Sequence, residues 1–445
     1  MSDRQSTKPA RGTRDFLPDD LRRREYVIGI VRDVYQRYGF EPLETPAFEN
    51  IETLMGKYGE EGNQLIFKIL KRGEHEKSGE ADLALRYDLT VPLARVVAEY
   101  QNALPTLFKR YQIQPVWRAD RPARGRFREF YQCDIDATGS TSPVVEAEIL
   151  GAVSEILTTL GFNDFVIRLN HRKLLSALLN QATIDPSQHS DALVALDKLD
   201  KIGPEGVRKE LEARGIPEPG RSAFVNWIGA GIDADLLDYL ESKFELLDDE
   251  GRAAFANLRQ IRDLAAQGPA RGRIRVDASL ARGLSYYTGA IMEIAVEGIG
   301  SLGGGGRYDN LVGMFLGRGM PACGFSLGLE RIIVVMTERD MFPPSVVTSA
   351  VDIVVTFLDD ASRAEALTLA GELRAAKYRV DVFPEASRKF DKPLKYASAR
   401  GARAMAIFGE NEVTRGEASI RNLETREQVS VPRADAASHI ARLLN

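Results

Sequence analysis

Apolar residues along this chain follow helical spacing in some stretches and strand-like spacing in others, in no regular order. Residues 27–38 repeat apolar side chains at helical spacing, and Gly39 ends the predicted helix. Segment 41–49 contains two prolines, which predicts an edge strand or an interface segment because proline cannot donate to a sheet. Residues 83–89 predict a short strand before a helix that starts near Pro92. Because hairpins interrupt the alternation of strands and helices, a mixed or antiparallel sheet is expected instead of a doubly wound one.

The clearest hairpin is formed by segments 108–117 and 127–135, which are rich in aromatic and branched residues and flank an arginine-rich loop. Side chains alternate between the two faces of a strand. One face of the second strand carries a polar set with Phe130 as its only apolar member: Arg126, Arg128, Gln132, Asp134 and Asp136. The other face carries Phe127, Tyr131, Cys133 and Ile135, with Glu129 as its only charge. The polar face could hold a polyanion near the loop and an amine-bearing ligand deeper along the strand, whereas a solvated hairpin with surface ion pairs fits the composition equally well.

Changes in residue composition and apolar spacing along the sequence predict several domains. Residues 1–173 form the first part of one domain, and 174–267 are expected to be a helical insertion, rich in Leu, Ala, Glu and Lys. Strand-like patterns return in 268–341, which predicts that the first domain resumes there. A Pro-Pro break follows, and 346–445 reads as β-α-β-α-β, a separate small α/β domain.

Composition narrows the class of protein. The chain has 445 residues, of which 44% are hydrophobic and 28% charged, and no apolar run is long enough to span a bilayer. Residues 1–14 are polar and basic without an apolar core, so no secretory signal and no membrane contact are expected, and a cytoplasmic location is predicted. The sequence has two cysteines, Cys133 and Cys323, which are too few for a disulfide framework. Its four histidines are not spaced like the ligands of a metal ion, so no protein-ligated metal is expected.

Two common nucleotide-binding loops are missing from the sequence. Gly56-Lys57 is followed by Tyr58, which does not fit a Walker loop, and the glycine run 303–306 leads into Arg307 without the further glycine that a dinucleotide fingerprint needs. Phosphoryl and adenylyl chemistry needs mainly positioning and charge stabilisation, and guanidinium groups on an antiparallel sheet supply both. Any bound nucleotide is therefore expected on the arginine hairpin.

Five motifs, in order, resemble those of one family. Segments 40–49, 117–136 and 321–331 resemble motifs 1, 2 and 3 of class II aminoacyl-tRNA synthetases. Arg-Gly-Leu-Ser-Tyr-Tyr-Thr-Gly at 282–289 and Gly-Gly-Gly-Arg-Tyr-Asp at 304–309 look like the histidine-specific signatures of histidyl-tRNA synthetases. The resemblance covers essentially the whole chain. It implies an α+β fold: a class II antiparallel sheet with flanking helices, a helical insertion, and a C-terminal α/β anticodon-binding domain.

The resemblance also implies which residues hold ATP. Arg118 matches the motif 2 arginine on the α-phosphate, and Arg282 matches an arginine that reaches the same phosphate and the substrate carboxylate. These two are the expected catalytic residues, because cations beside the reacting phosphorus stabilise the extra negative charge of the transition state. Arg126 and Arg331 match positions at the γ-phosphate, although Arg331 could instead pair at the end of a core helix.

A second set of matching residues is expected to bind histidine. Asp88, Thr90 and Gln132 match residues on the α-amino group, with Leu89 in the same segment. Asp136 and Tyr287 match residues on the imidazole, with Tyr286 beside them, although the two tyrosines could simply pack as aromatic side chains. A carboxylate on one ring nitrogen and a phenol on the other would recognise both polar edges of histidine.

Two departures from the family pattern affect this pocket. Ser285 stands where the family commonly has an acidic residue, and Asp88 and Asp136 stand where many bacterial members carry glutamates. The glycine run is expected to let the backbone approach a ligand closely, with a glycine-rich turn as the alternative. At the loop tip, Arg121 and Arg124 are expected to face the acceptor end of tRNA.

The function implied by the resemblance is ligation of histidine to tRNA(His). Histidine and ATP, with Mg²⁺ bound through the phosphates, would give histidyl-adenylate, and the histidyl group would pass to the 3′-terminal ribose. Motif 1 implies a homodimer. The alternative is a catalytically inactive histidine-sensing relative, such as a regulatory subunit of ATP phosphoribosyltransferase, but such relatives typically lack the C-terminal domain and the arginines present here. A prolyl or threonyl enzyme is disfavoured by the 282–289 signature.

Overall fold

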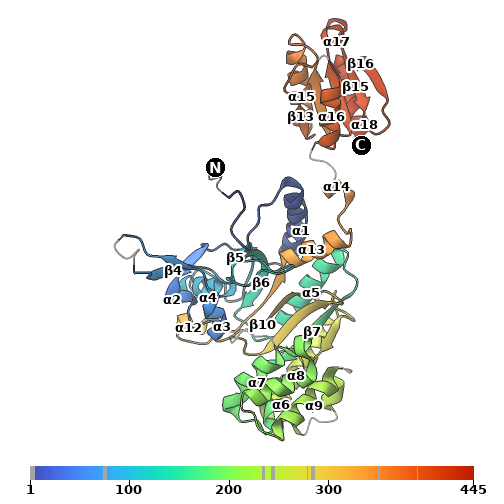
Figure 1. Ribbon diagram of the computed structural model, residues 1–445. Helices are drawn as coiled ribbons and strands as arrows, with labels where there is room; N and C mark the ends of the chain where they lie inside the picture. Colours follow the sequence, from blue (N-terminus) through green and yellow to red (C-terminus); the bar gives the residue numbers. More distant parts are fainter. Residues whose placement is uncertain are drawn as a thin grey trace. The chain divides into compact units, whose positions relative to one another are not determined.

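The computed structural model describes residues 6–73, 78–232, 236–241, 246–277, 279–281, 286–347, 351–387 and 389–444. The chain divides into two compact units, residues 1–341 and 342–445, which appear blue to orange and orange to red in Figure 1. None of the helices in these described ranges is both long and apolar enough to cross a bilayer.

An eight-stranded sheet organises the first unit. Its strands, in spatial order, are β1 (Glu41–Pro42), β5 (Phe108–Trp117), β6 (Glu129–Thr138), β11 (Ala322–Gly328), β10 (Gly300–Arg307), β9 (Ala290–Val296), β7 (Phe165–His171) and β8 (Ile274–Val276). Only the outermost pairs, β1 with β5 and β7 with β8, are parallel, and the inner pairs are antiparallel. The predicted antiparallel-rich sheet is therefore confirmed.

The predicted hairpin strands match the structure with one shift. The first strand coincides with β5, whereas the second begins at Glu129, two residues later than expected. At Arg128 the backbone N–H donates to the carbonyl of Gly12 at 2.8 Å, outside the hairpin, and only the carbonyl pairs across it, with the Arg118 N–H at 2.9 Å. The glycine-dense segment is strand β10 and not a turn.

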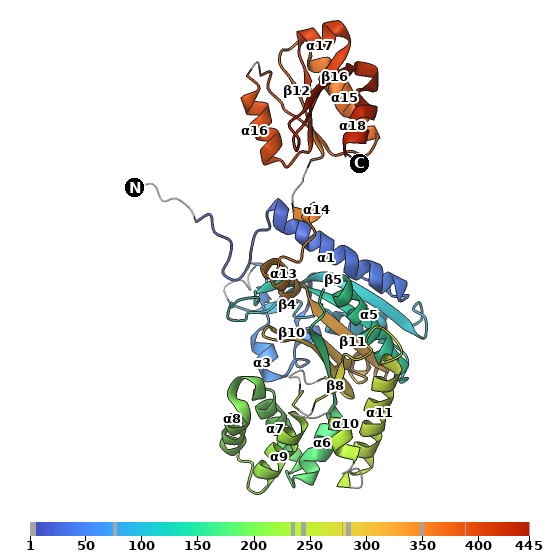
Figure 2. The ribbon, with the colours of Figure 1, turned by 90° about the vertical axis from the view of Figure 1, so that its right-hand side faces the viewer.

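Helices cover one face of this sheet. Helix α1 (Pro18–Arg37) begins at a proline followed by two aspartates, which suit the positive end of the helix, and it buries Val27, Val31 and Val34. It contacts α5 (Val144–Thr159) and α13 (Leu329–Glu338), near which it lies in Figure 2, and these two helices contact β6. The helices thereby fix β6 from behind and leave its other face to the site.

A small sheet lies beside the main one. It consists of β2 (Phe48–Asn50), β4 (Ala81–Leu85) and β3 (Lys68–Leu70) in the order β2-β4-β3. Four short helices accompany it: α2 (Ile51–Leu54), α3 (Gly59–Gln64), α4 (Thr90–Glu99) and α12 (Gly313–Leu316). The expected strand-to-helix step at 83–92 is therefore present, and Pro92 lies in the first turn of α4.

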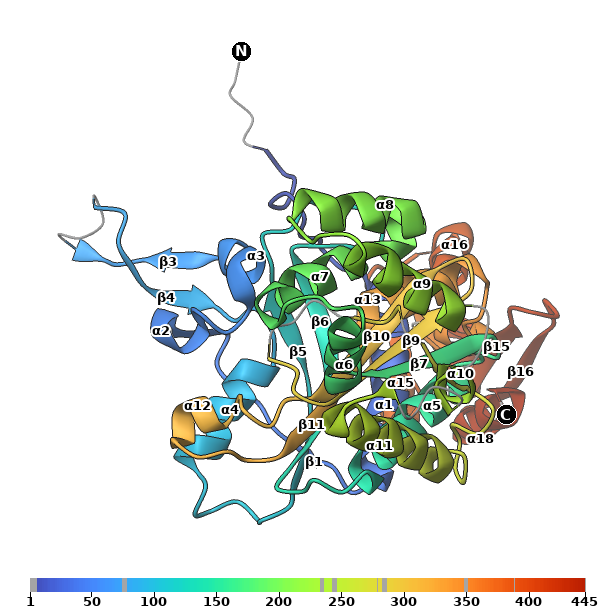
Figure 3. The same cartoon turned by 90° about the horizontal axis from the view of Figure 1, so that it is seen from below.

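Six helices follow β7 in the segment expected to be an insertion. They are α6 (Arg172–Gln181), α7 (His189–Leu196), α8 (Leu199–Ala213), α9 (Gly220–Ile232), α10 (Leu236–Glu241) and α11 (Asp249–Ala265), seen in front of the main sheet in Figure 3. Their apolar side chains, such as Leu196 and Phe224, belong to the same core cluster as Tyr286 and Tyr287. The insertion therefore packs continuously with the site region, and its separate domain status stays a prediction.

The second unit is a five-stranded sheet with helices. Its strands run in the order β13 (Val380–Val382), β12 (Ile353–Phe357), β14 (Ala404–Phe408), β15 (Glu417–Asn422) and β16 (Gln428–Pro432). The helices are α15 (Arg363–Ala375), α16 (Asp391–Ala399), α17 (Glu410–Arg415) and α18 (Ala436–Leu444), and α14 (Pro344–Val347) precedes the sheet. The expected β-α-β-α-β pattern is present, and the sequence interpretation missed β15, β16 and α18.

Candidate active site

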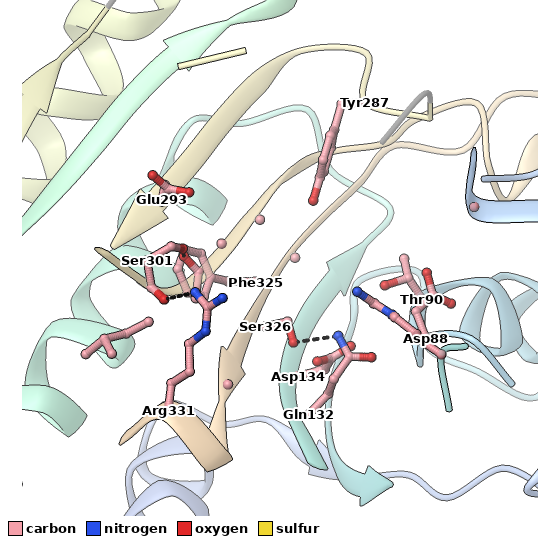
Figure 4. A pocket seen from close by; sticks show the side chains of 18 of the residues that line it. Asp88, Thr90, Gln132, Asp134, Tyr287, Glu293, Ser301, Phe325, Ser326 and Arg331 are labelled. Carbon is pink, nitrogen blue, oxygen red and sulfur yellow. Dashed lines mark hydrogen bonds between the residues drawn. The ribbon is translucent and has the colours of Figure 1, made fainter. Parts of the chain in front are cut away.

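A cavity of about 570 Å³ opens on the face of the main sheet away from α1. Its lining comes from the β4–α4 turn, the β5–β6 loop, strands β6, β9, β10 and β11, the start of α13, and the α7–α8 junction. In Figure 4, Asp88 and Thr90 lie on one side, Arg331 and Ser301 on the opposite side, and Gln132 between them. The cavity thus has an acidic end and an arginine end.

Most of the residues expected to form a site line this cavity. They are Asp88, Thr90, Arg118, Arg126, Gln132, Asp136, Tyr286, Tyr287 and Arg331. Leu89 does not line it: its side chain is fully buried, and its carbonyl accepts a hydrogen bond from Arg110 Nη2 at 3.1 Å. Arg121 and Arg124 are exposed on the β5–β6 loop, and Arg282 lies outside the described residues.

Strand β6 supplies the floor of the cavity. Because side chains alternate, Gln132, Asp134 and Asp136 all point to the cavity side. Gln132 Nε2 donates to Ser326 Oγ on β11 at 2.8 Å. Asp136 lies opposite Arg110 on β5, and its Oδ2 is 2.9 Å from Arg110 Nη2. The floor therefore holds two carboxylates beside one buried guanidinium.

Neighbouring strands fix Asp136 on its other side. The hydroxyl of Tyr308, which follows β10, donates to Asp136 Oδ1. Gly324 stands directly opposite Asp136 on β11, and a Cβ atom there would overlap the Asp136 carboxylate. Glycine at 324 is therefore required by the carboxylate that faces it.

Burial controls the electrostatics of the acidic end. It raises the pKa of the Asp134 carboxyl to about 7, against the attraction of Arg110. It also raises the pKa of Asp136, opposed by Arg110 and the Tyr308 hydrogen bond. The pKa of Asp88 is raised by burial as well, opposed by hydrogen bonds and by Arg118. Such a group of carboxyls favours a ligand that brings a positive charge or hydrogen-bond donors.

Asp88 is held by donors from three segments. Its Oδ1 accepts from the Tyr58 hydroxyl at 3.0 Å and from the Val91 backbone N–H at 3.1 Å, in the first turn of α4. Its Oδ2 accepts from the Tyr286 hydroxyl at 3.4 Å. The carboxylate is therefore fixed in orientation at the edge of the cavity.

The arginines are held by different means. Arg118 donates through Nε to the Tyr87 carbonyl at 3.0 Å, and its guanidinium lies over the rings of Tyr87 and Phe130. Arg126 pairs with Asp120 at 2.7 Å. Arg331 Nη1 donates to the Ser301 carbonyl at 2.5 Å. Arg118 lies close enough to Asp88 to oppose the increase in its pKa that burial causes, and Arg331 lies on the opposite side of the cavity, so guanidiniums from two sides are available to phosphate groups.

Comparison with known proteins decides the family. The family model described as Histidyl-tRNA synthetase matches residues 12–332. The chain belongs to the histidyl-tRNA synthetase family. A second family model, described as Anticodon binding domain, matches residues 350–443 in the second unit.

Relatives of this family resemble the chain over nearly its full length. A histidine–tRNA ligase of Gloeobacter violaceus is 42% identical and covers 97% of both chains, and one of Porphyromonas gingivalis is 40% identical and covers 98% of both. The crystal structure of histidyl-tRNA synthetase from Nostoc superposes with a TM-score of 0.82 at 32% identity, covering 99% of this chain and 100% of that one.

Several cavity residues of this family member were not singled out by the sequence interpretation. Alternation placed Asp134 on the correct face of its strand, but no role was assigned to it. Tyr58 gave no local signal, and Glu330 fell within the segment that resembles motif 3 but was given no role. Glu330 Oε2 accepts from Arg14 at 2.6 Å and from Arg24 at 2.7 Å, and Arg14 lies 3.3 Å from the centre of the Phe127 ring in the cavity wall. These contacts join segments that are far apart in the sequence, so spacing could not reveal them.

Proposed function

We propose that this chain couples cleavage of ATP to AMP and pyrophosphate with the ligation of L-histidine to tRNA(His). A carboxylate oxygen of histidine attacks the α-phosphorus of ATP and pyrophosphate leaves, which gives histidyl-adenylate. A hydroxyl of the 3′-terminal ribose of the tRNA then attacks the activated carbonyl, and AMP leaves. The observation that carries the proposal is one cavity that combines buried carboxylates with the guanidiniums of Arg118, Arg126 and Arg331, in a chain of this family.

The acidic end would hold the amino acid. The α-ammonium group would lie between Asp88, Thr90 and Gln132, where charge and hydrogen-bond acceptors are concentrated. Tyr287, whose hydroxyl is directed into the cavity in Figure 4, would meet the imidazole from the opposite wall, with Tyr286 beside it. The carboxylate partner of the ring would come from the β6 floor, where the sequence pattern points to Asp136.

The arginine end would hold ATP. Arg118 would contact the α-phosphate, and Arg126 and Arg331 the terminal phosphates, so that positive charge surrounds the phosphorus under attack. For Arg282, the role on the α-phosphate and substrate carboxylate rests on its place in the family signature. Mg²⁺ would enter as part of the nucleotide substrate, bound through the phosphates.

The remaining partners follow from the family. Arg121 and Arg124 lie on an exposed loop next to the cavity wall, where they would meet the acceptor end of tRNA. The second unit would read the anticodon, as its family model indicates. We also propose a homodimer, on the basis of motif 1, and a cytoplasmic location.

Amino-acid-dependent ATP–pyrophosphate exchange tests this function. The purified protein should exchange pyrophosphate with histidine and with none of the other nineteen amino acids at a comparable rate. The histidine-sensing alternative predicts binding of histidine without exchange. Binding with no exchange, under conditions where the tRNA-charging reaction is also absent, would overturn the proposal.

A further inference from the structure

Strand β7 runs beside the chain segment that leads into the 282–289 signature. Strand β8 pairs in parallel with β7, and just after it the backbone N–H of Asp277 donates to the Leu169 carbonyl at 2.9 Å. The next described residues, Ser279, Leu280 and Ala281, line the cavity. The proposed reaction gives no role to the polar side chains of β7, although these side chains hold this segment.

The contacts begin at Arg168. Its guanidinium donates to three oxygen atoms: Asp277 Oδ2 at 2.7 Å, Ser279 Oγ at 2.6 Å and Glu293 Oε1 at 3.1 Å. Ser279 is fixed from a second side, because its backbone N–H and its hydroxyl both donate to Asp277 Oδ1, at 2.8 Å and 2.6 Å. The guanidinium therefore joins the turn after β8 to strand β9.

Asn170 and Arg172 continue the row of contacts toward the signature. Asn170 shares a face of β7 with the residue two positions before it, and Arg172 follows the strand directly as the first residue of α6. The fully buried Asn170 donates through Nδ2 to the Leu280 carbonyl at 2.9 Å. Arg172 donates through Nη1 to the Ala281 carbonyl at 3.2 Å. Alternate residues of one segment thereby hold successive residues of the other.

Arg172 also holds the far end of the signature. The backbone N–H of the first residue of a helix has no partner inside the helix, and that of Arg172 donates to the Gly289 carbonyl at 3.0 Å. Ala281 precedes the signature and Gly289 closes it. Because consecutive Cα atoms are about 3.8 Å apart, fixing both carbonyls restrains Tyr286 and Tyr287, which stand between them in the chain and line the cavity (Figure 4 labels Tyr287).

We propose that Arg168, Asn170 and Arg172 are positioning residues for the formation of histidyl-adenylate, with Arg172 having the largest effect. They act through the backbone that they hold on either side of the signature, which carries Arg282 and Tyr287, and not through a contact of their own with a substrate. Misplacing a reacting group by about 1 Å can cost about 100-fold in rate. The inference rests on the proposed function and extends it to residues outside all five motifs.

Single-turnover formation of histidyl-adenylate measures the effect. Arg172→Met keeps most of the side-chain volume but removes the donor to Ala281, so the rate constant per active site should fall about 10- to 100-fold. Arg172→Lys restores a donor on a similar stem and should be at least fivefold faster than Arg172→Met. Lys173→Met removes an exposed cation at the next position and is the matched control, which should keep the wild-type rate.

Two readouts separate positioning from a loss of structure. Active-site titration counts the competent sites, and a substitution that only unfolds part of the protein lowers that count without changing the rate constant per site. The KM for ATP in Arg172→Met should change less than threefold, because Arg118, Arg126 and Arg331 lie on other segments. The KM for histidine should rise about 3- to 10-fold, because Tyr287 belongs to the restrained signature.

A wild-type rate constant per active site in Arg172→Met would overturn the inference, and so would equal defects in Arg172→Met and Arg172→Lys. Should Arg172→Met fail to fold, Ser279→Ala decides: it removes the oxygen that Arg168 holds with little change in volume, and the rate constant should fall about 3- to 10-fold. An unchanged rate constant there would contradict the inference. Histidine-dependent pyrophosphate exchange by the wild-type protein separates this failure from failure of the proposed function, since that exchange can be intact while every variant behaves like wild type.

Discussion

Replacing Asp134 by asparagine should stabilise the ligand-free protein at pH 8. Burial raises the pKa of this carboxyl from 3.8 to about 7 in the folded protein. In the unfolded chain the pKa stays near its ordinary value of about 4. Between about pH 4 and pH 7 the native state therefore holds a proton that the unfolded chain has lost. Stability falls as the pH rises through that window and remains lower above it, and asparagine has no charge to bury.

The magnitude follows from the two pKa values. About three pKa units at about 1.4 kcal/mol each set an upper bound of about 4 kcal/mol on the destabilisation by Asp134 above pH 7. Asparagine also gives up the attraction between Asp134 and Arg110, which offsets part of the gain. We therefore expect a net increase of roughly 1–3 kcal/mol in the free energy of unfolding. In a unit of this size that is a rise of a few degrees in Tm.

Scanning calorimetry of the wild-type protein and the variant at pH 5, 6, 7 and 8, without histidine or ATP, measures this effect. The Tm difference should be small at pH 5 and should grow to its full value by pH 8, with the variant more stable. Asp82→Asn, which changes an exposed carboxylate on β4, is the matched control and should show no such trend. A variant that is less stable than the wild type at pH 8, or a difference that is equal at all four pH values, would refute the reasoning.

Three further substitutions test other parts of the site. Tyr58→Phe removes the hydroxyl that donates to Asp88 at 3.0 Å, so the KM for histidine in the exchange assay should rise about 3- to 10-fold while the KM for ATP is unchanged. Arg118→Lys keeps the charge but loses the Nε hydrogen bond and the stacking on two rings. The rate of pyrophosphate exchange should therefore fall about 100-fold or more. A near-normal rate would exclude the proposed role of Arg118 on the α-phosphate. Arg14→Ala removes the contacts to the cavity wall and to motif 3, so the KM for ATP should rise about 5- to 30-fold, with exposed Arg11→Ala as the unaffected control.

Local pattern was enough to predict much of the fold. Segment 108–117 has a run of aromatic and branched residues and coincides with β5. The hairpin of β15 and β16 was missed because β16 is short and largely exposed, so the alternation of Val429 and Val431 with polar residues spans only five positions. The glycine run formed a strand because its backbone pairs on both sides, with β9 and β11, and that pairing outweighs the weak strand preference of glycine.

The site was predictable only where it depends on a single strand. Alternation along β6 is by itself enough to put Gln132, Asp134 and Asp136 on one face. What distinguishes the two carboxylates comes from other strands: Arg110 through the register of β5, and Tyr308 through the end of β10. Register between distant strands has no signature in local sequence, so the different partners of the two carboxylates could not be predicted.

Burying the carboxylates of the cavity floor costs folding free energy, and the same burial affects which amino acid the cavity favours. Asp88, Asp134 and Asp136 are all buried, repulsion from Asp88 raises the pKa of the other two, and the guanidinium of Arg110 is fully buried beside them. An apolar floor would favour folding more. Under the proposed function, an amino acid with an apolar side chain would bring only its ammonium group and would give the buried carboxylates of the floor no donor from its side chain. A buried acceptor left without its donor rejects the wrong ligand more strongly than a difference in shape does. The buried carboxyls that lower the stability of the ligand-free protein would therefore favour a side chain that donates a hydrogen bond.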